Sequence, residues 1–83
     1  MADGAPENAI AEFIEREIAY DREPSRIDPD ELLLEGLVDS TDMLRLVLFV
    51  EERFGVHVED EELVPENFES VRALAAFVES KLA

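Results

Sequence analysis

The sequence predicts an all-α fold: a small four-helix bundle with three main helices, one short helix and a long loop between the first two main helices. Three segments carry apolar residues at spacings of three and four, which is the period of an amphipathic helix. Residues 21–38 break this period with two prolines and a glycine. At 83 residues, of which 47% are hydrophobic, the chain has room for one modest core. We therefore expect a single domain over residues 1–83.

The first helix is expected from Pro6 to about Tyr20. Proline suits the first position of a helix, where a backbone N–H would have no partner inside the helix. The apolar residues that line one face of this segment are Ile10, Phe13, Ile14 and Ile18.

The loop that follows, Asp21–Val38, is long for so small a domain. Loops of this length usually carry function or contain a short helix of their own, and we expect one helical turn over Asp30–Leu34. Apolar residues are expected to hold the loop against the core. They are Ile27, Leu32, Leu33, Leu34, Leu37 and Val38.

The second helix is predicted from Asp39-Ser40 to Phe54, with Gly55 just past its end. Thr41, Leu44 and Leu48 lie on a face beside the main apolar stripe. The helix is thus more apolar around its circumference than a surface helix needs, which indicates a central position or contact with a partner. The residues of the main stripe are Met43, Leu46, Val47, Val50 and Phe54.

The last third of the chain predicts a short acidic helical turn over Asp60–Val64, stopped by Pro65, and then a final helix capped by Ser70. Phe68 is expected to anchor the connection in the core. Lys81 complements the dipole at the end of the final helix. The buried stripe of that helix is expected at Val71, Leu74, Ala75, Val78 and Leu82.

The charge of the chain is strongly negative. Seven Lys and Arg residues against 22 Asp and Glu residues give a formal net charge of −15. This balance argues against binding to nucleic acid or to an anionic membrane, since both need a basic patch, and it favours a basic protein partner. No signal peptide is expected, because residues 1–7 lack the basic and apolar regions of such a peptide. No membrane span is expected either, because the longest apolar run, Leu46–Val50, is far too short. We expect a cytoplasmic monomer.

Catalytic chemistry finds little support. The chain has no cysteine and one histidine, His57, so cysteine nucleophiles, Cys-based metal sites and His-rich metal sites are excluded. The expected second helix separates His57 from Ser40 by about 22 Å, too far for a hydrogen-bonded pair. We expect no metal site and no catalytic residue.

The junction Gly36-Leu37-Val38-Asp39-Ser40-Thr41-Asp42 is the most distinctive feature. It allows two interpretations. In the first, Asp39 or Ser40 caps the second helix by accepting from a free backbone N–H. In the second, Ser40 carries a phosphate ester, which the positive end of the helix dipole would favour, and Asp39 and Asp42 mark the site for a basic modifying enzyme.

The junction, the helix sequence LVLFVEERF over residues 46–54 and the acidic segment 58–71 resemble the acyl carrier protein and peptidyl carrier protein family, in the form of a discrete member. The resemblance runs from about Ala9 to Leu82. It implies that the protein is a carrier and not an enzyme. It also implies that a phosphopantetheinyl transferase attaches 4′-phosphopantetheine from coenzyme A to Ser40, next to Asp39, and that cargo is held as a thioester on the arm.

The resemblance further implies a docking surface for loading and synthase enzymes that present basic patches. For Leu44, packing against the first loop is an equal alternative, and for the two glutamates the alternative is a solvated face. The implied docking residues are Thr41, Asp42, Leu44, Leu48, Glu51 and Glu52.

Three residues depart from the family pattern, namely Thr41, Arg45 and Phe49. They favour a specialised polyketide, nonribosomal peptide or amino-acid-loading pathway over general fatty acid biosynthesis. Phe49 and Phe77 either fill a cavity for the cargo or simply pack. A different class of function, an acidic helical adaptor without a prosthetic group, stays open as the alternative.

Overall fold

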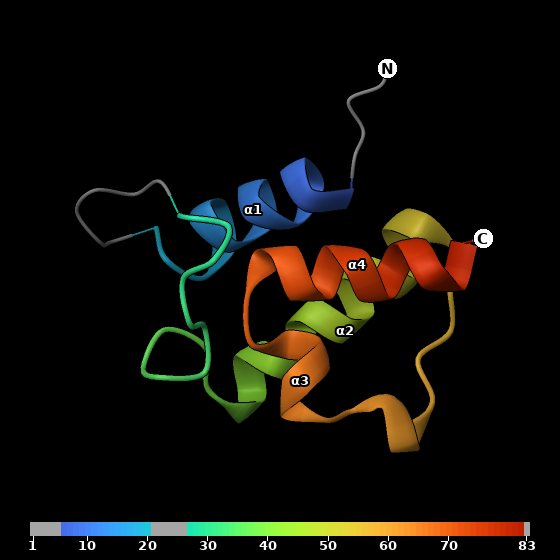
Figure 1. The fold of residues 1–83 in the computed structure, drawn as a ribbon. Helices are drawn as coiled ribbons and strands as arrows, with labels where there is room; N and C mark the ends of the chain where they lie inside the picture. Colours follow the sequence, from blue (N-terminus) through green and yellow to red (C-terminus); the bar gives the residue numbers. More distant parts are fainter. Residues whose placement is uncertain (1–5, 21–26, 83) are drawn as a thin grey trace.

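The computed structural model describes residues 6–20 and 27–82. It confirms the all-α fold with three main helices, one short helix and a long connection after the first (Figure 1). The elements are α1 (Pro6–Glu17), α2 (Ser40–Phe54), the 3₁₀ turn η1 (Asp60–Glu62), α3 (Pro65–Phe68) and α4 (Val71–Leu82).

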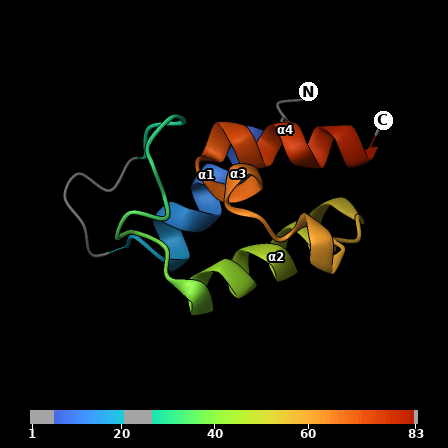
Figure 2. The same cartoon turned by 60° about the horizontal axis from the view of Figure 1, so that its bottom comes forward.

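The core lies between α4, α1 and α2, and Figure 2 shows α2 and α4 on opposite sides of it. Each main helix contributes residues of the face that its periodicity predicts, and the loop before α2 adds three buried side chains, those of Ile27, Leu33 and Val38. This confirms that the loop is held against the core. The largest fully buried side chains are Ile10, Ile14, Leu33, Leu46, Val50, Phe68, Val71, Leu74 and Val78.

The predicted helical turn over Asp30–Leu34 is wrong, because the backbone groups of this segment bond elsewhere. The N–H of Asp30 donates to the side chain of Asp28 at 2.8 Å, which favours a turn over a helix. The N–H of Leu33 donates across to the carbonyl of Glu69 at 2.8 Å. The segment therefore forms turns that are fixed from outside.

Arg72 at the start of α4 holds the same loop. Its Nε lies 2.6 Å from Asp30 Oδ1, and its backbone N–H donates to the carbonyl of Pro29 at 2.9 Å. The hydrogen bond from Arg72 lowers the pKa of Asp30, and the same bond raises the pKa of Arg72. The loop that leads to α2 is thus tied to α4 by both backbone and side chain.

Four boundary or burial predictions also need correction. The first helix ends at Glu17, not near Tyr20, because the N–H groups of Ile18 and Ala19 both turn back to the carbonyl of Ile14, at 3.0 and 2.7 Å. Leu32 is exposed, whereas its neighbour Leu33 is the residue that enters the core. Leu82 is 53% exposed, because it ends α4 and no described element covers it.

The fourth correction concerns the short elements before α4. The expected turn over Asp60–Val64 is shorter, at Asp60–Glu62, and the short helix α3 begins at Pro65. Proline stands at the first helical position, which was the available signal for this helix. The prediction that Ser70 caps the last helix is confirmed, since its hydroxyl accepts from the N–H of Ala73 at 3.1 Å.

Candidate functional site

The cap of α2 is Asp39, not Ser40. Asp39 Oδ1 accepts a hydrogen bond from the N–H of Asp42 at 2.8 Å, and the Asp39 carbonyl accepts from the N–H of Met43 at 2.8 Å. The backbone of Asp39 is extended, at φ −94° and ψ −174°, as expected for a residue just before a helix. The ambiguity between the two capping residues is therefore resolved in favour of Asp39.

Ser40 is left as the first residue of α2, with an exposed side chain. Among residues 6–20 and 27–82, no group hydrogen-bonds to its hydroxyl. The hydroxyl stands at the positive end of a 15-residue helix, where a phosphate anion is stabilised by the dipole. Ser40 is thus free to form an ester bond without loss of the helix cap.

The loop before Ser40 holds the serine at a fixed place. Leu33 and Val38 are buried, and the N–H of Val38 donates to the carbonyl of Leu33 at 2.8 Å, which closes the turn between them. Gly36 in this turn has φ +117°, a conformation that favours glycine. The chain therefore leaves the core at Val38 and presents Asp39 and Ser40 to solvent.

Leu44 and Leu48 share one exposed side of α2. They are 60% and 58% exposed, so the alternative that Leu44 packs against the first loop is excluded. Thr41 is also exposed. Ser40, Leu44 and Leu48 follow each other at intervals of four residues, so that they lie along one side of the helix.

Asp42 and Arg45, three positions apart on α2, form an ion pair, with 3.6 Å between Asp42 Oδ1 and Arg45 Nη1. Arg45 also reaches α1, where Glu17 offers its carbonyl at 3.3 Å and its carboxylate at 3.4 Å. The positive charge of Arg45 is therefore compensated inside the molecule.

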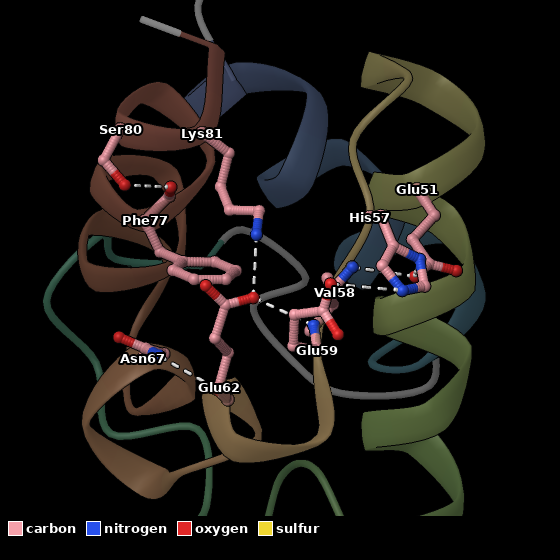
Figure 3. Close-up of polar contacts among 9 residues, drawn as sticks. All are labelled: Glu51, His57, Val58, Glu59, Glu62, Asn67, Phe77, Ser80 and Lys81. Carbon is pink, nitrogen blue, oxygen red and sulfur yellow. Dashed lines mark hydrogen bonds and ion pairs between the residues drawn. The ribbon is translucent and has the colours of Figure 1, made fainter.

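Glu51 has an internal role that the sequence did not indicate. Its Oε2 accepts from the N–H of Val58 at 2.9 Å and lies 3.5 Å from Nδ1 of His57 (Figure 3). Glu51 and Val58 are seven positions apart, and the chain between them passes through the left-handed turn at Gly55, so no local spacing rule could have predicted this bond. Glu52, by contrast, is exposed and makes no hydrogen bond or ion pair with the rest of the described chain.

Glu62 forms the centre of a second cluster, which ties the chain after α2 to α4 (Figure 3). Its Oε1 accepts from Lys81 Nζ at 2.8 Å and from the N–H of Glu59 at 2.9 Å, while its carbonyl accepts from Asn67 at 2.8 Å. The hydrogen bond from Lys81, followed by that from Glu59, lowers the pKa of Glu62.

His57 does not approach Ser40. It is exposed and lies between Glu51 and Glu59, at 3.5 and 3.6 Å. No cluster of three or more metal-ligating side chains occurs in the parts of the chain that the structure describes. Phe49 stacks on Phe13 and so packs against α1.

None of the described helices is long and apolar enough to cross a membrane.

The family model described as the phosphopantetheine attachment site matches residues 8–78, close to the extent of the resemblance expected from the sequence. No curated protein matches the chain. Members of this family are non-catalytic carriers that hold 4′-phosphopantetheine covalently, are modified by phosphopantetheinyl transferases and interact with the enzymes of their pathways. Since the match covers most of the chain, this protein belongs to the family of phosphopantetheine-bearing carrier proteins.

Proposed function

We propose that Ser40 is the attachment residue and that the protein carries acyl or aminoacyl intermediates as thioesters. The observation that supports this assignment most is the division of roles at the start of α2. Asp39 caps the helix, and the exposed hydroxyl of Ser40 has no hydrogen bond to the described part of the chain. A phosphodiester on Ser40 would leave the cap intact.

The arm supplies, when bound, the thiol that this cysteine-free chain lacks. The residues of the chain have simpler tasks. Ser40 Oγ forms the bond to the phosphorus that carries the pantetheine arm of coenzyme A and gives up its proton, while the phosphoanhydride bond of coenzyme A breaks and 3′,5′-adenosine bisphosphate leaves. Asp39 keeps the first turn of α2 in place. The free N–H groups of that turn stabilise the negative charge of the phosphodiester.

The proposed docking surface follows α2 away from Ser40 and contains Thr41, Asp42, Leu44, Leu48, Glu51 and Glu52. The exposure of Leu44 and Leu48 supports it, because large apolar side chains on one side of a helix often meet a partner. Glu51 can offer a partner only the oxygen that Val58 does not use. Both carboxylate oxygens of Glu52 are available to a partner, so we propose that Glu52 contributes more than Glu51 to the electrostatic attraction of a basic partner.

The pathway is proposed to be a specialised one, such as polyketide, nonribosomal peptide or amino-acid-loading biosynthesis. Thr41, Arg45 and Phe49 support this, because they depart from the family pattern at or beside the docking surface. The contacts of Arg45 with Glu17 and of Phe49 with Phe13 show that two of these residues couple α2 to α1 in this chain.

The test is the addition of the arm. Incubation with coenzyme A and a broad-specificity phosphopantetheinyl transferase is expected to add one phosphopantetheinyl mass to the wild-type protein and none to Ser40→Ala. Ser80→Ala is the matched control, since Ser80 is also an exposed helical serine, and it is expected to be modified like the wild type. Modification of Ser40→Ala, or a wild type that several transferases leave unmodified, would contradict the assignment.

The alternative of an acidic adaptor without a prosthetic group is separated by the mass of the protein purified from its own cell. A carrier is expected to be modified there at least in part. A fully unmodified protein whose activity survives Ser40→Ala would favour the adaptor.

A further inference from the structure

Side chains that could attack a thioester are scarce in this chain. It has no cysteine, one histidine, His57, and one lysine, Lys81, so that six of its seven basic residues are arginine. The distinction matters because arginine keeps its proton in proteins, whereas lysine can lose one and become a nucleophile. Lys81 is therefore the one side chain whose amine could take an acyl or aminoacyl group from a thioester.

The amine of Lys81 is held by its neighbours near the end of α4 (Figure 3). Its Nζ donates to Glu62 Oε1 at 2.8 Å and lies 5.6 Å from the centre of the Phe77 ring. The side chain is only 21% exposed. The acceptor is also fixed, since the N–H of Glu59 donates to the same oxygen at 2.9 Å. An ammonium nitrogen has no lone pair, so Nζ would have to leave Glu62 and lose a proton before it could attack a carbonyl carbon.

His57, the second candidate nucleophile, also faces carboxylates. Its Nδ1 lies 3.5 Å from Glu51 Oε2, and its Nε2 lies 3.6 Å from Glu59 Oε2. His57 follows the end of α2 that is opposite to Ser40, and the 15 residues of this helix span about 22 Å. Lys81 is tied to the same segment after α2. Distance from Ser40 and contact with acids therefore restrain both nucleophiles.

We propose that the ion pair with Glu62 withholds Lys81 from the thioester, so that the chain does not acylate itself. The inference rests on the proposed function, because it concerns a cargo held as a thioester. In the reaction that the ion pair opposes, the neutral Nζ of Lys81 forms a C–N bond to the thioester carbonyl carbon, and the C–S bond breaks. The proton that the nitrogen loses passes through water to the departing thiolate. The cargo would then stay on Lys81 as an amide, and the positive charge that pairs with Glu62 would be lost.

The test compares Lys81 with a lysine that has no partner. Arg53 lies in the last turn of α2, is exposed, and makes no hydrogen bond or ion pair within residues 6–20 and 27–82. Arg53→Lys thus places an unpaired amine at this end of α2 without a change of net charge. The variant is loaded from acetyl-coenzyme A by a broad-specificity transferase, desalted to remove the free donor, and kept at mildly alkaline pH. Mass spectrometry of its peptides follows acetylation at positions 53 and 81.

The amine at position 53 is expected to be acetylated at least about threefold faster than Lys81 in the same molecule, a factor within the range of one partly exposed ion pair. Glu62→Gln removes the charge but keeps an acceptor for the N–H of Glu59, and it is expected to raise acetylation of Lys81 by about the same factor. Glu61→Gln, which removes an exposed charge next to Glu62, is expected to change that rate less than about twofold. Circular dichroism checks that each variant is folded.

The same comparison is repeated with acetyl-coenzyme A in solution and with Ser40→Ala in the background of each protein, so that the donor reaches every lysine without the arm. The same order of rates is expected. The proposal is overturned if Lys81 reacts as fast as the amine at position 53, or if Glu62→Gln leaves the rate at Lys81 unchanged.

Failure of the carrier assignment is read separately, as the absence of a phosphopantetheinyl mass on the wild-type protein. The reactivity of Lys81 toward dissolved acetyl-coenzyme A is measured whether or not that mass is present, so the two failures are distinguishable.

Discussion

At the residue scale, the start of α2 divides two tasks between adjacent side chains. Asp39→Ala removes the carboxylate that accepts from the N–H of Asp42, so we expect the free energy of unfolding to fall by about 1 kcal/mol, the usual effect of losing a cap. Ser40→Ala removes a hydroxyl that is exposed and unbonded within the described chain, and a surface change of this kind is expected to stay within about 0.5 kcal/mol. Urea denaturation measures both. If Ser40→Ala lowers the free energy of unfolding more than Asp39→Ala does, Asp39 is not the residue that caps α2.

Glu51 and Glu52 provide a second contrast between neighbours. Glu51→Ala leaves the N–H of Val58, a buried residue, without its acceptor, and a polar group stranded in this way costs about 1–3 kcal/mol. Glu52→Ala removes a solvated carboxylate and is expected to change stability by less than about 0.5 kcal/mol. Urea denaturation at neutral pH gives both values. Equal losses would mean that the contact between Glu51 and Val58 does not stabilise the fold.

Sequence patterns predicted the location of the candidate site but not the role of every residue in it. They pointed to the junction before α2 and to Ser40 as the proposed attachment residue, but they did not decide whether Asp39 or Ser40 caps α2, because Asp and Ser are equally good capping residues. They left Leu44 open, because a helical period gives the angle of a side chain and not what stands opposite. Only the exposed fraction of 60% decides that question. The role of Glu51 depends on the path of the chain after Gly55, which no local pattern specifies.

At the element scale, the three main helices were predictable because their periods are local. The loop before α2 was not, because its conformation is decided by α4. Leu33 and Arg72 make their backbone bonds across this boundary, with Glu69 and Pro29 as acceptors. A helix over Asp30–Leu34 would have to give up these bonds. The conformation of this loop is therefore determined by contacts with residues about 40 positions away and not by local helix propensity.

The element that links α2 to α4 is expected to respond to acid through Glu62. Its pKa is lowered by Lys81 and by the N–H of Glu59. A carboxyl whose pKa is lower in the folded state stabilises the fold above its ordinary pKa of about 4.3, and this contribution is lost as the pH falls through the lowered value. Lys81→Met is expected to bring the pKa of Glu62 back toward its ordinary value and to reduce stability at pH 6 more than at pH 3.

Two measurements check this expectation. NMR titration of the Glu62 carboxyl carbon follows its pKa in both proteins, and urea denaturation at the two pH values follows stability. The cation–π contact of Lys81 with Phe77, at 5.6 Å, does not titrate in this range, so its loss affects both pH values alike. If Glu62 titrates at the same pH in Lys81→Met and in the wild type, the ion pair does not set its pKa.

At the scale of the whole molecule, the net negative charge follows directly from the sequence, and the ion pairs of the fold neutralise only a small part of it. The described ion pairs bring Arg16, Arg45, Arg72 and Lys81 against acidic side chains. Twenty-two acids against seven bases still leave an excess of 15 negative charges. This excess opposes the compact state by self-repulsion, and it suits the proposed docking on basic partners.

We therefore expect salt to stabilise the protein. The molecule measures 35 × 31 × 20 Å, and the Debye length falls from about 30 Å at 0.01 M to about 8 Å at 0.15 M ionic strength. Carboxylates on opposite sides repel each other at the lower value and are screened at the higher one. For a domain of this size, the Tm is expected to rise by about 4–8 °C for each kcal/mol of repulsion removed.

Thermal unfolding, followed by circular dichroism in NaCl and in MgCl₂ at equal ionic strength, tests this expectation. Both salts screen charge, so a higher Tm in MgCl₂ than in NaCl would indicate specific cation binding. The double variant Glu61→Gln with Glu66→Gln lacks two surface charges, so its Tm is expected to rise less with salt than the Tm of the wild type. If the Tm of the wild type is the same at 0.01 and 0.15 M ionic strength, the net charge does not destabilise this fold.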